Sequence, residues 1–258
     1  SRNRIYVLRQ DMNQLLVYDG LTMNLIATVP TGTSPTIMSM PRDQSLLLVG
    51  HDDSEYIYVY DLNTLMPLTP ILLPGGHFAR SIAVSNAAIL ALVRNEGGDP
   101  AGLIDSINLA GRTATALPSL GVYENKLPTS TGVLTASPSG SSILMVTPDG
   151  NVALYSAASN SFVVSRHDLS SLSGAFAASD YGVYVAGNSV LNASLVPSGT
   201  LSATGLSSSG FSFVNQGGYM AASASASTAG TMLQLSSLQS GTAGPTSVLM
   251  TEAPLLPV

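Results

Sequence analysis

Two groups of side chains in the first half of the sequence have residue types and spacing that could support chemistry. The first is the segment His51-Asp52-Asp53-Ser54-Glu55. Carboxylate oxygens supplied by one loop suit Ca²⁺, which makes Asp52, Asp53 and Glu55 weak metal candidates. The spacing of an EF-hand loop is missing, however, so a solvated acidic loop is the simpler interpretation. We therefore expect no cofactor, with Ca²⁺ as the alternative.

The second group combines possible bases with cations and consists of His77, Arg80, Arg94 and Glu124. An imidazole or a carboxylate can act as a general base, and an arginine presents planar N–H donors that fit a carboxylate or phosphate. If the protein is an enzyme, we expect His77 and Glu124 to be catalytic. If it only binds, we expect Arg80, Arg94, His77 and His51 to contact the ligand.

The composition excludes several classes of protein. The 258 residues include no Cys and no Trp, and only 9% are charged, with 9 Lys and Arg against 15 Asp and Glu. Without cysteine there is no disulfide framework, thiolate nucleophile or cysteine zinc site. Since a basic surface is absent, we expect no nucleic-acid partner.

The elements that must hold these residues are short strands. Mean hydropathy is positive, at +0.32, but no apolar run approaches the ~20 residues that span a bilayer, so we expect no membrane span. The longest runs, each bounded by turn residues, lie at Leu46 to Val49, Ile71 to Leu73, Ala87 to Val93 and Ile143 to Val146. Runs of this length, with alternation of β-branched residues and no sustained helical period, predict an all-β chain.

An internal repeat defines the predicted architecture. The segment around Val17-Tyr18-Asp19 recurs about 42 residues later as Val59-Tyr60-Asp61, and looser copies follow. One period contains four strand-like runs, at Ile37 to Met40, Leu46 to Gly50, Tyr56 to Asp61 and Leu68 to Leu73. Six such periods predict a β-propeller of six four-stranded blades in a single domain, residues 1–258.

The first period lacks its innermost strand. It begins at Ile5 to Leu8, while the C-terminal end offers Ser247 to Thr251 and Leu255 to Val258. We therefore expect closure by exchange of a terminal strand. The alternative is a piece of a seven- or eight-bladed ring. Because the chain starts at Ser1 without a signal peptide, we expect a processed form or part of a longer chain.

The first periods resemble a known bacterial family. The segments Arg4-Ile5-Tyr6-Val7-Leu8, Leu16-Val17-Tyr18-Asp19 and Ile26 to Pro35 are similar to the YVTN-type repeat of surface-layer and related propellers. The likeness covers about the first 90 residues and departs from the family pattern at Arg9, where the repeat has asparagine. It implies the fold, whereas propellers host many activities.

Propeller topology predicts where the candidate residues meet. Loops between second and third strands, and those leading from one blade to the next, lie on one face, and this face receives all three histidines together with both groups described above. We expect the ligand there. Polar loops need no ligand, however, so an ordinary solvated face is the competing interpretation.

Three functional classes remain. We expect a non-catalytic, monomeric binding or scaffold propeller that captures a protein or glycan partner. The alternative is a lactonase-like hydrolase, and a structural module of a longer chain is the third. A single lysine and a segment without charge from Tyr181 to Thr251 favour a secreted, periplasmic or cell-surface location in a bacterium.

Overall fold

The computed structural model describes residues 3–96, 103–122, 132–169, 172–201, 206–224, 230–238, 242–243 and 245–250. Within these ranges the chain is all-β, as the sequence predicts, and its one helical turn is the 3-10 helix η1 (Gln10–Met12). No helix in the described part of the chain has both the length and the apolar character that a membrane crossing requires. Two compact units can be distinguished. The first comprises residues 1–84, 88–119 and 127–132, and the second residues 85–87, 120–126 and 133–258.

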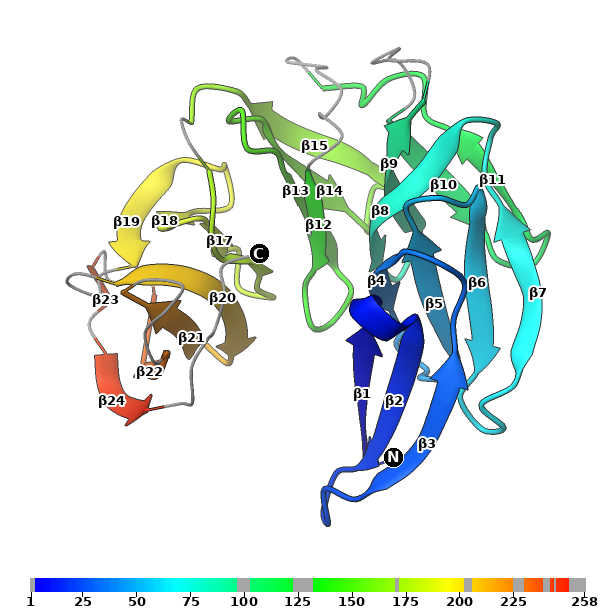
Figure 1. Cartoon of the computed structure of the whole chain (residues 1–258). Coiled ribbons are helices and arrows are strands. Elements are labelled where there is room, and N and C mark those ends of the chain that lie inside the picture. Colours follow the sequence, from blue (N-terminus) through cyan, green and yellow to red (C-terminus); the bar gives the residue numbers. More distant parts are fainter. Residues whose placement is uncertain are drawn as a thin grey trace. The chain divides into compact units, whose positions relative to one another are not determined.

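The first unit contains three consecutive antiparallel meanders (Figure 1). Its strands are β1 (Arg4–Arg9), β2 (Gln14–Asp19), β3 (Leu25–Pro30), β4 (Pro35–Ser39), β5 (Leu46–His51), β6 (Tyr56–Asp61), β7 (Pro67–Leu72), β8 (His77–Val84), β9 (Ile89–Asn95), β10 (Ile104–Asn108) and β11 (Thr113–Ala116). Strands β1–β3 form a three-stranded sheet, which agrees with the missing inner strand expected from the sequence. The meanders β4–β7 and β8–β11 join into eight strands through a single parallel pair, Thr113 with Leu72.

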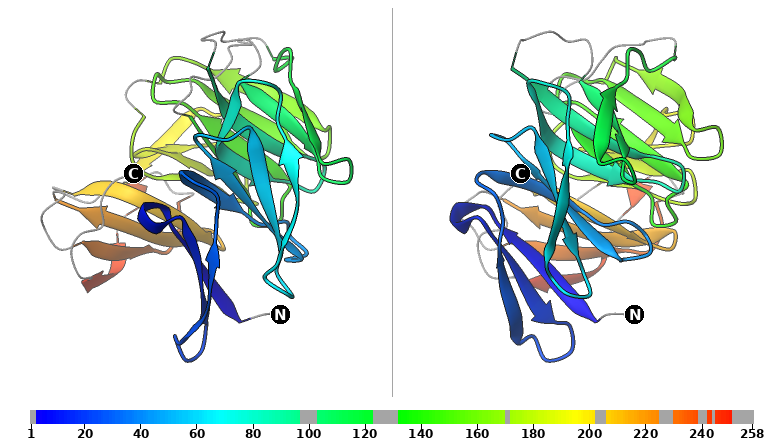
Figure 2. Two further views of the ribbon diagram at one scale, coloured as in Figure 1. Left: turned by 45° about the vertical axis from the view of Figure 1, so that its right-hand side comes forward. Right: turned by 90° about the vertical axis from the view of Figure 1, so that its right-hand side faces the viewer.

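The second unit repeats the same arrangement (Figure 2). Its strands are β12 (Val133–Ala136), β13 (Ser142–Val146), β14 (Val152–Ser156), β15 (Ser161–Arg166), β16 (Phe176–Ala178), β17 (Tyr184–Ala186), β18 (Ser189–Leu191), β19 (Pro197–Leu201), β20 (Ser207–Val214), β21 (Gly217–Ser223), β22 (Thr231–Leu235), β23 (Thr242–Ala243) and β24 (Pro245–Met250). The meanders are β12–β15, β16–β19 with β23 added in parallel, and β20–β21–β22–β24. Residues 245–250 thus form the outer strand of the last sheet. Leu255 to Val258 lie outside the described residues.

Within each unit, consecutive meanders stack face to face. Leu47 packs with Leu15 and Val17 of the first meander, while its neighbour Leu48 packs with Ala79 of the third meander. Successive side chains of a strand point to opposite faces, so β5 is buried on both faces. This explains why β5 is a continuous apolar run and does not alternate. In the second unit, the same stacking buries Leu144 against Ala186.

A recurring turn follows the strand that carries the repeated Asp. The carboxylate of Asp19 accepts hydrogen bonds from the backbone N–H of Leu21 and Thr22, at 2.9 and 2.8 Å. Asp61 does the same one repeat later, and the turns close at residues with positive φ, Met23 and Leu65. Asp and Asn side chains stabilise such turns by replacing a backbone acceptor. The repeated Asp is therefore structural.

Candidate functional site

The structure brings most of the predicted site residues to one end of the first unit. The end of β5, the start of β6, the start of β8 and the end of β9 share that end, because the strands alternate in direction. The residues concerned are His51, Asp52, Asp53, Glu55, His77, Arg80 and Arg94. Glu124 lies outside the described residues, so its role as a catalytic base stays a prediction.

Asp52 joins two arginines into one charged group. Its Oδ1 atom lies 2.7 Å from Arg80 Nε and 3.1 Å from Arg94 Nε, and its backbone carbonyl accepts a 2.7 Å hydrogen bond from Arg94 Nη2. The three side chains remain between 33% and 37% exposed. We refer to Asp52, Arg80, Arg94 and Phe78 as the arginine cluster. With two cations and one carboxylate, it carries an excess positive charge.

Two local features orient the side chains of Arg80 and Arg94 toward Asp52. The pairing of β8 with β9 shifts between Ala79 and Ser81, so Arg80 is the extra residue of a β-bulge, and bulges redirect a side chain out of the regular alternation. Arg94 in turn lies over the ring of Phe78, with Cζ 4.3 Å from the ring centroid. A cation over an aromatic face is attracted by the ring quadrupole. The bulge therefore positions Arg80 beside Asp52, and the ring of Phe78 positions Arg94 there.

The acidic residues of the first group are used separately. Asp52 forms ion pairs with Arg80 and Arg94. Glu55 Oε1 accepts a 2.5 Å hydrogen bond from the backbone N–H of Gly76, where φ is +78°. Among the described residues, no group of three or more His, Asp or Glu side chains is arranged to hold a metal ion. The structure thus does not bring Asp52, Asp53 and Glu55 together as cation ligands.

His51 lies inside the sheet packing. It has no exposed surface, and its ring meets that of Tyr58 edge to face, with the centroids 4.5 Å apart. Neither ring nitrogen meets hydrogen-bond geometry with a partner among the described residues. Burial lowers the pKa of His51, and the nearby charge of Asp53 offsets part of this. His51 is therefore a buried imidazole in which the charged form is disfavoured, and it has no surface that a ligand could touch.

His77 has a buried carboxylate partner. Its Nδ1 atom lies 3.0 and 2.9 Å from the two carboxylate oxygens of Asp105 on β10, and the His77 and Asp105 side chains are 8% and 0% exposed. Burial raises the pKa of Asp105, and the contact with His77 opposes this. A carboxylate on one ring nitrogen fixes the orientation and tautomer of an imidazole. This is the arrangement of a base with its orienting group.

Sequence reasoning missed Asp105 and Phe78 as parts of these groups. Asp105 carries a usable signal in the sequence, however. It stands inside the strand Ile104-Asp105-Ser106-Ile107, on the same face as the buried Ile107. Because Asp is almost never fully buried without a partner, such a position predicts a nearby His or Arg. Phe78 gave no comparable signal, because an aromatic residue at the start of a strand is common.

Comparisons with known proteins support the fold and go no further. The sequence matches no protein-family model and no curated protein. Among solved structures, hydrazine synthase of Kuenenia stuttgartiensis is similar with a TM-score of 0.63 and 16% identity, over 90% of this chain and 73% of that one. The computationally designed Ika8 protein is similar with a TM-score of 0.62 and 16% identity, over 98% of this chain and 79% of that one.

A chain of the mitotic checkpoint complex has a TM-score of 0.68 and 12% identity, over 96% of this chain and 76% of that one. These three proteins differ widely in what they do. At such identities the likeness concerns the fold, and propeller-like folds in particular support many functions. This chain shares a sheet architecture with all three.

Proposed function

We propose that this chain is a six-bladed β-propeller acting as a non-catalytic binding module, with its ligand at the arginine cluster. The support for the ring is the series of stacked meanders, the turn repeated after Asp19 and Asp61, and the fold likeness to the solved structures. The resemblance to YVTN-type repeats fits the same proposal and suggests a bacterial protein. The segment without charge from Tyr181 to Thr251 favours a secreted or envelope location, and we propose that the protein is monomeric.

Ring closure is the part of this proposal that is open to a direct test. One face of the first sheet leaves Ile5 and Val7 each 39% exposed, as expected for a face that another blade should cover. We propose that Leu255 to Val258 add the missing inner strand beside β1. A seven-bladed ring would instead require a further blade from elsewhere.

The natural absence of cysteine makes the closure experiment clean. Val7→Cys would be combined in turn with Leu255→Cys, Leu256→Cys and Val258→Cys, and each pair oxidised in dilute solution. We expect an intramolecular disulfide for at least one pair and none for the control pair Val7→Cys with Val163→Cys, an exposed position on β15. No disulfide in any of the three pairs would reject closure by this segment.

The single observation that carries the binding proposal is the sharing of Asp52 by Arg80 and Arg94. One carboxylate cannot use every N–H of two guanidinium groups, and the cluster is partly open to solvent. The remaining donors suit an acidic group of a protein or glycan partner, because guanidinium forks fit carboxylates. We infer that the ligand carries a carboxylate or a similar planar anion.

The test uses glucuronate as the probe, followed by NMR chemical shifts of the backbone amides. We expect saturable shifts at β8 and β9, weakened at least about fivefold in Arg80→Ala and Arg94→Ala, consistent with loss of a charge-assisted contact. Arg166→Ala is the matched control, because Arg166 is paired with Asp168 at 2.7 Å in the second unit. Equal affinity in all variants would reject the site, and a Ca²⁺ titration tests the metal alternative.

A second function is favoured by the contact between His77 and Asp105. A buried carboxylate that orients an imidazole suits a general base for hydrolysis, so a lactonase-like activity is the alternative proposal, with Glu124 as a further candidate base. Hydrolysis of gluconolactone, measured by acid release, would test it. If the alternative holds, His77→Gln should abolish an activity that the native protein shows. No activity in the native protein would remove it.

A further inference from the structure

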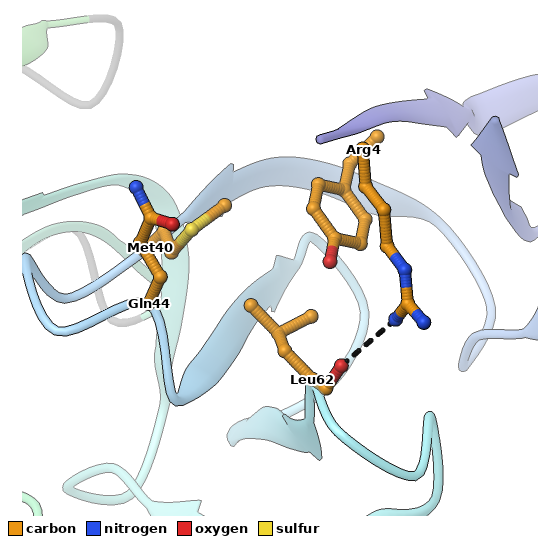
Figure 3. A pocket seen from close by; sticks show the side chains of 5 residues that line it. Arg4, Met40, Gln44 and Leu62 are labelled. Carbon is orange, nitrogen blue, oxygen red and sulfur yellow. Dashed lines mark hydrogen bonds between the residues drawn. The ribbon is translucent and has the colours of Figure 1, made fainter. Parts of the chain in front are cut away.

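A pocket lies at the other end of the first unit from the arginine cluster. Its lining residues, drawn as sticks in Figure 3, are Arg4, Tyr6, Met40, Gln44 and Leu62. Its volume is about 80 Å³. They stand at the start of β1, after the end of β4, before β5 and after the end of β6. A cavity that holds one water needs ~10–15 Å³, so this pocket has room for several waters or for the end of a small ligand.

Arg4 supplies a cation that no carboxylate compensates among the described residues. Its Nη1 atom donates a 3.0 Å hydrogen bond to the backbone carbonyl of Leu62, drawn as the dashed line in Figure 3. Asp19 is opposite Arg4 in the pairing of β1 with β2, but its carboxylate accepts from the N–H groups of its own turn. Arg9, on the same strand, is by contrast paired with Asp11.

Tyr6 supplies a hydroxyl without a partner. The OH atom is buried and has no hydrogen bond within the part of the chain that the structure describes. Arg4 and Tyr6 are two residues apart on β1, so they lie on the same face of the strand. A buried hydroxyl that makes no hydrogen bond is costly, and an acceptor entering the pocket would satisfy it.

Of the remaining lining residues, Met40 and Leu62 are apolar and Gln44 is polar. Leu62 is fully buried, and its backbone N–H donates to Ser45 at 2.9 Å. Met40 contributes a flexible thioether side chain, which adapts readily to small apolar groups. The pocket therefore combines a guanidinium and a hydroxyl donor with an apolar surface next to them.

We propose that this pocket binds a monocarboxylate with a short aliphatic group. The carboxylate accepts from the Arg4 guanidinium and the Tyr6 hydroxyl, and the aliphatic group contacts Met40 and Leu62. The same chemistry is offered by a free short-chain acid and by the C-terminus of a peptide that ends in a small apolar residue. This site is separate from the arginine cluster and does not depend on the function proposed there.

The experiment titrates the intact chain with isobutyrate and follows the Met40 methyl signal by NMR, assigned through Met40→Leu. We expect a saturable shift with isobutyrate and none with the neutral isobutyramide. Arg4→Gln should weaken binding at least about tenfold, in line with loss of a charged hydrogen bond. Tyr6→Phe should weaken it about threefold or more without lowering the stability of the free protein, because the hydroxyl it removes has no partner.

Arg9→Gln is the matched control, because it removes a cation from the same strand outside the pocket, and it should leave binding unchanged. An N-acetylated alanyl-valine dipeptide and its C-terminal amide distinguish the two sources. Tighter binding of the acid than of isobutyrate identifies a peptide terminus, and weaker binding identifies a free acid. An equal response to isobutyrate and isobutyramide, or no response to isobutyrate, would overturn the proposal even if Arg4→Gln fails to fold.

Discussion

The imidazole of His77 is held by both carboxylate oxygens of Asp105, a residue 28 positions further along the chain. The contact connects the first strand of the third meander, β8, to its third strand, β10, across β9. The side chains of both residues are buried. The contribution of this contact to stability therefore differs from that of the partly exposed arginine cluster. Buried pairs are costly to break from one side, because the remaining group then lacks a partner.

This contact gives the first prediction. We expect Asp105→Ala to lower the free energy of unfolding by about 3 kcal/mol, because it leaves a buried imidazole unpaired. Residues in direct contact couple by about 0.5–3 kcal/mol, so the double variant His77→Ala, Asp105→Ala should lose less than the sum of the two single losses. Urea unfolding of all four proteins, followed through NMR signals of the first unit, gives the coupling. Additive losses would show that the two side chains do not stabilise each other.

The second prediction concerns the pH dependence set by His51. Its pKa in the folded state lies below the ordinary value of 6.5, so the unfolded chain binds the proton more readily. The free energy of unfolding should therefore fall as the pH drops below about 6.5. Above that pH the stability should no longer depend on the protonation of His51. NMR titration of the ring should give a midpoint below 6.5.

His51→Leu should make the first unit less sensitive to acid, whereas His167→Gln, a change at an exposed position, should not. The comparison is made by urea unfolding at pH 8 and pH 5. A His51 ring that titrates at or above 6.5 would contradict the lowered pKa that burial implies.

The third prediction concerns the carboxylate inside the arginine cluster. Asp52 accepts a hydrogen bond from Arg94 Nε and lies 2.7 Å from Arg80 Nε as an ion pair, so its charge competes with that of an external anion for both guanidinium groups. Removing its charge with Asp52→Asn should strengthen glucuronate binding about fivefold, since a charge pair at 4 Å contributes about 1 kcal/mol in water. Stability should fall by no more than about 1 kcal/mol, as is usual for partly exposed ion pairs.

Calorimetric titration at low salt measures this change, and addition of salt should reduce the gain. Asp168→Asn, which frees Arg166 in the second unit, is the matched control. Unchanged or weaker binding in Asp52→Asn would show that the arginines do not receive the anion.

The fourth prediction tests the packing of the last sheet. A Cβ atom at Gly217 would clash with the backbone carbonyl oxygen of Leu235, whereas one at Gly210 would meet nothing within 4 Å. Gly217→Ala should therefore cost about 2 kcal/mol or more through overpacking. Gly210→Ala, in the same sheet, should change stability by less than about 0.5 kcal/mol. Thermal unfolding of both variants decides, and equal losses would contradict the described pairing of β21 with β22.

Much of the strand order could be predicted, because short apolar runs bounded by turn residues mark the strands in the sequence. The strands β4 to β7 lie where the runs at Ile37 to Met40, Leu46 to Gly50, Tyr56 to Asp61 and Leu68 to Leu73 predict them. Strand β8 begins at His77, although the sequence predicts His77 and Arg80 in a loop on one face of the propeller. These polar residues favour a loop in the sequence, because the partners that compensate their burial and charge, Asp105 and Asp52, come from distant parts of the chain.

The sequence by itself determined the strands, the repeated turns and the gathering of charged residues at one end of the first unit, since these follow from alternation and chain direction. Only the tertiary structure decided which charges meet. It placed Asp52 between two arginines, buried His51 and paired His77 with Asp105. The physical reason is that these contacts join residues far apart in the sequence, and residue spacing indicates neither the bulge at Arg80 nor the partner that a buried side chain meets.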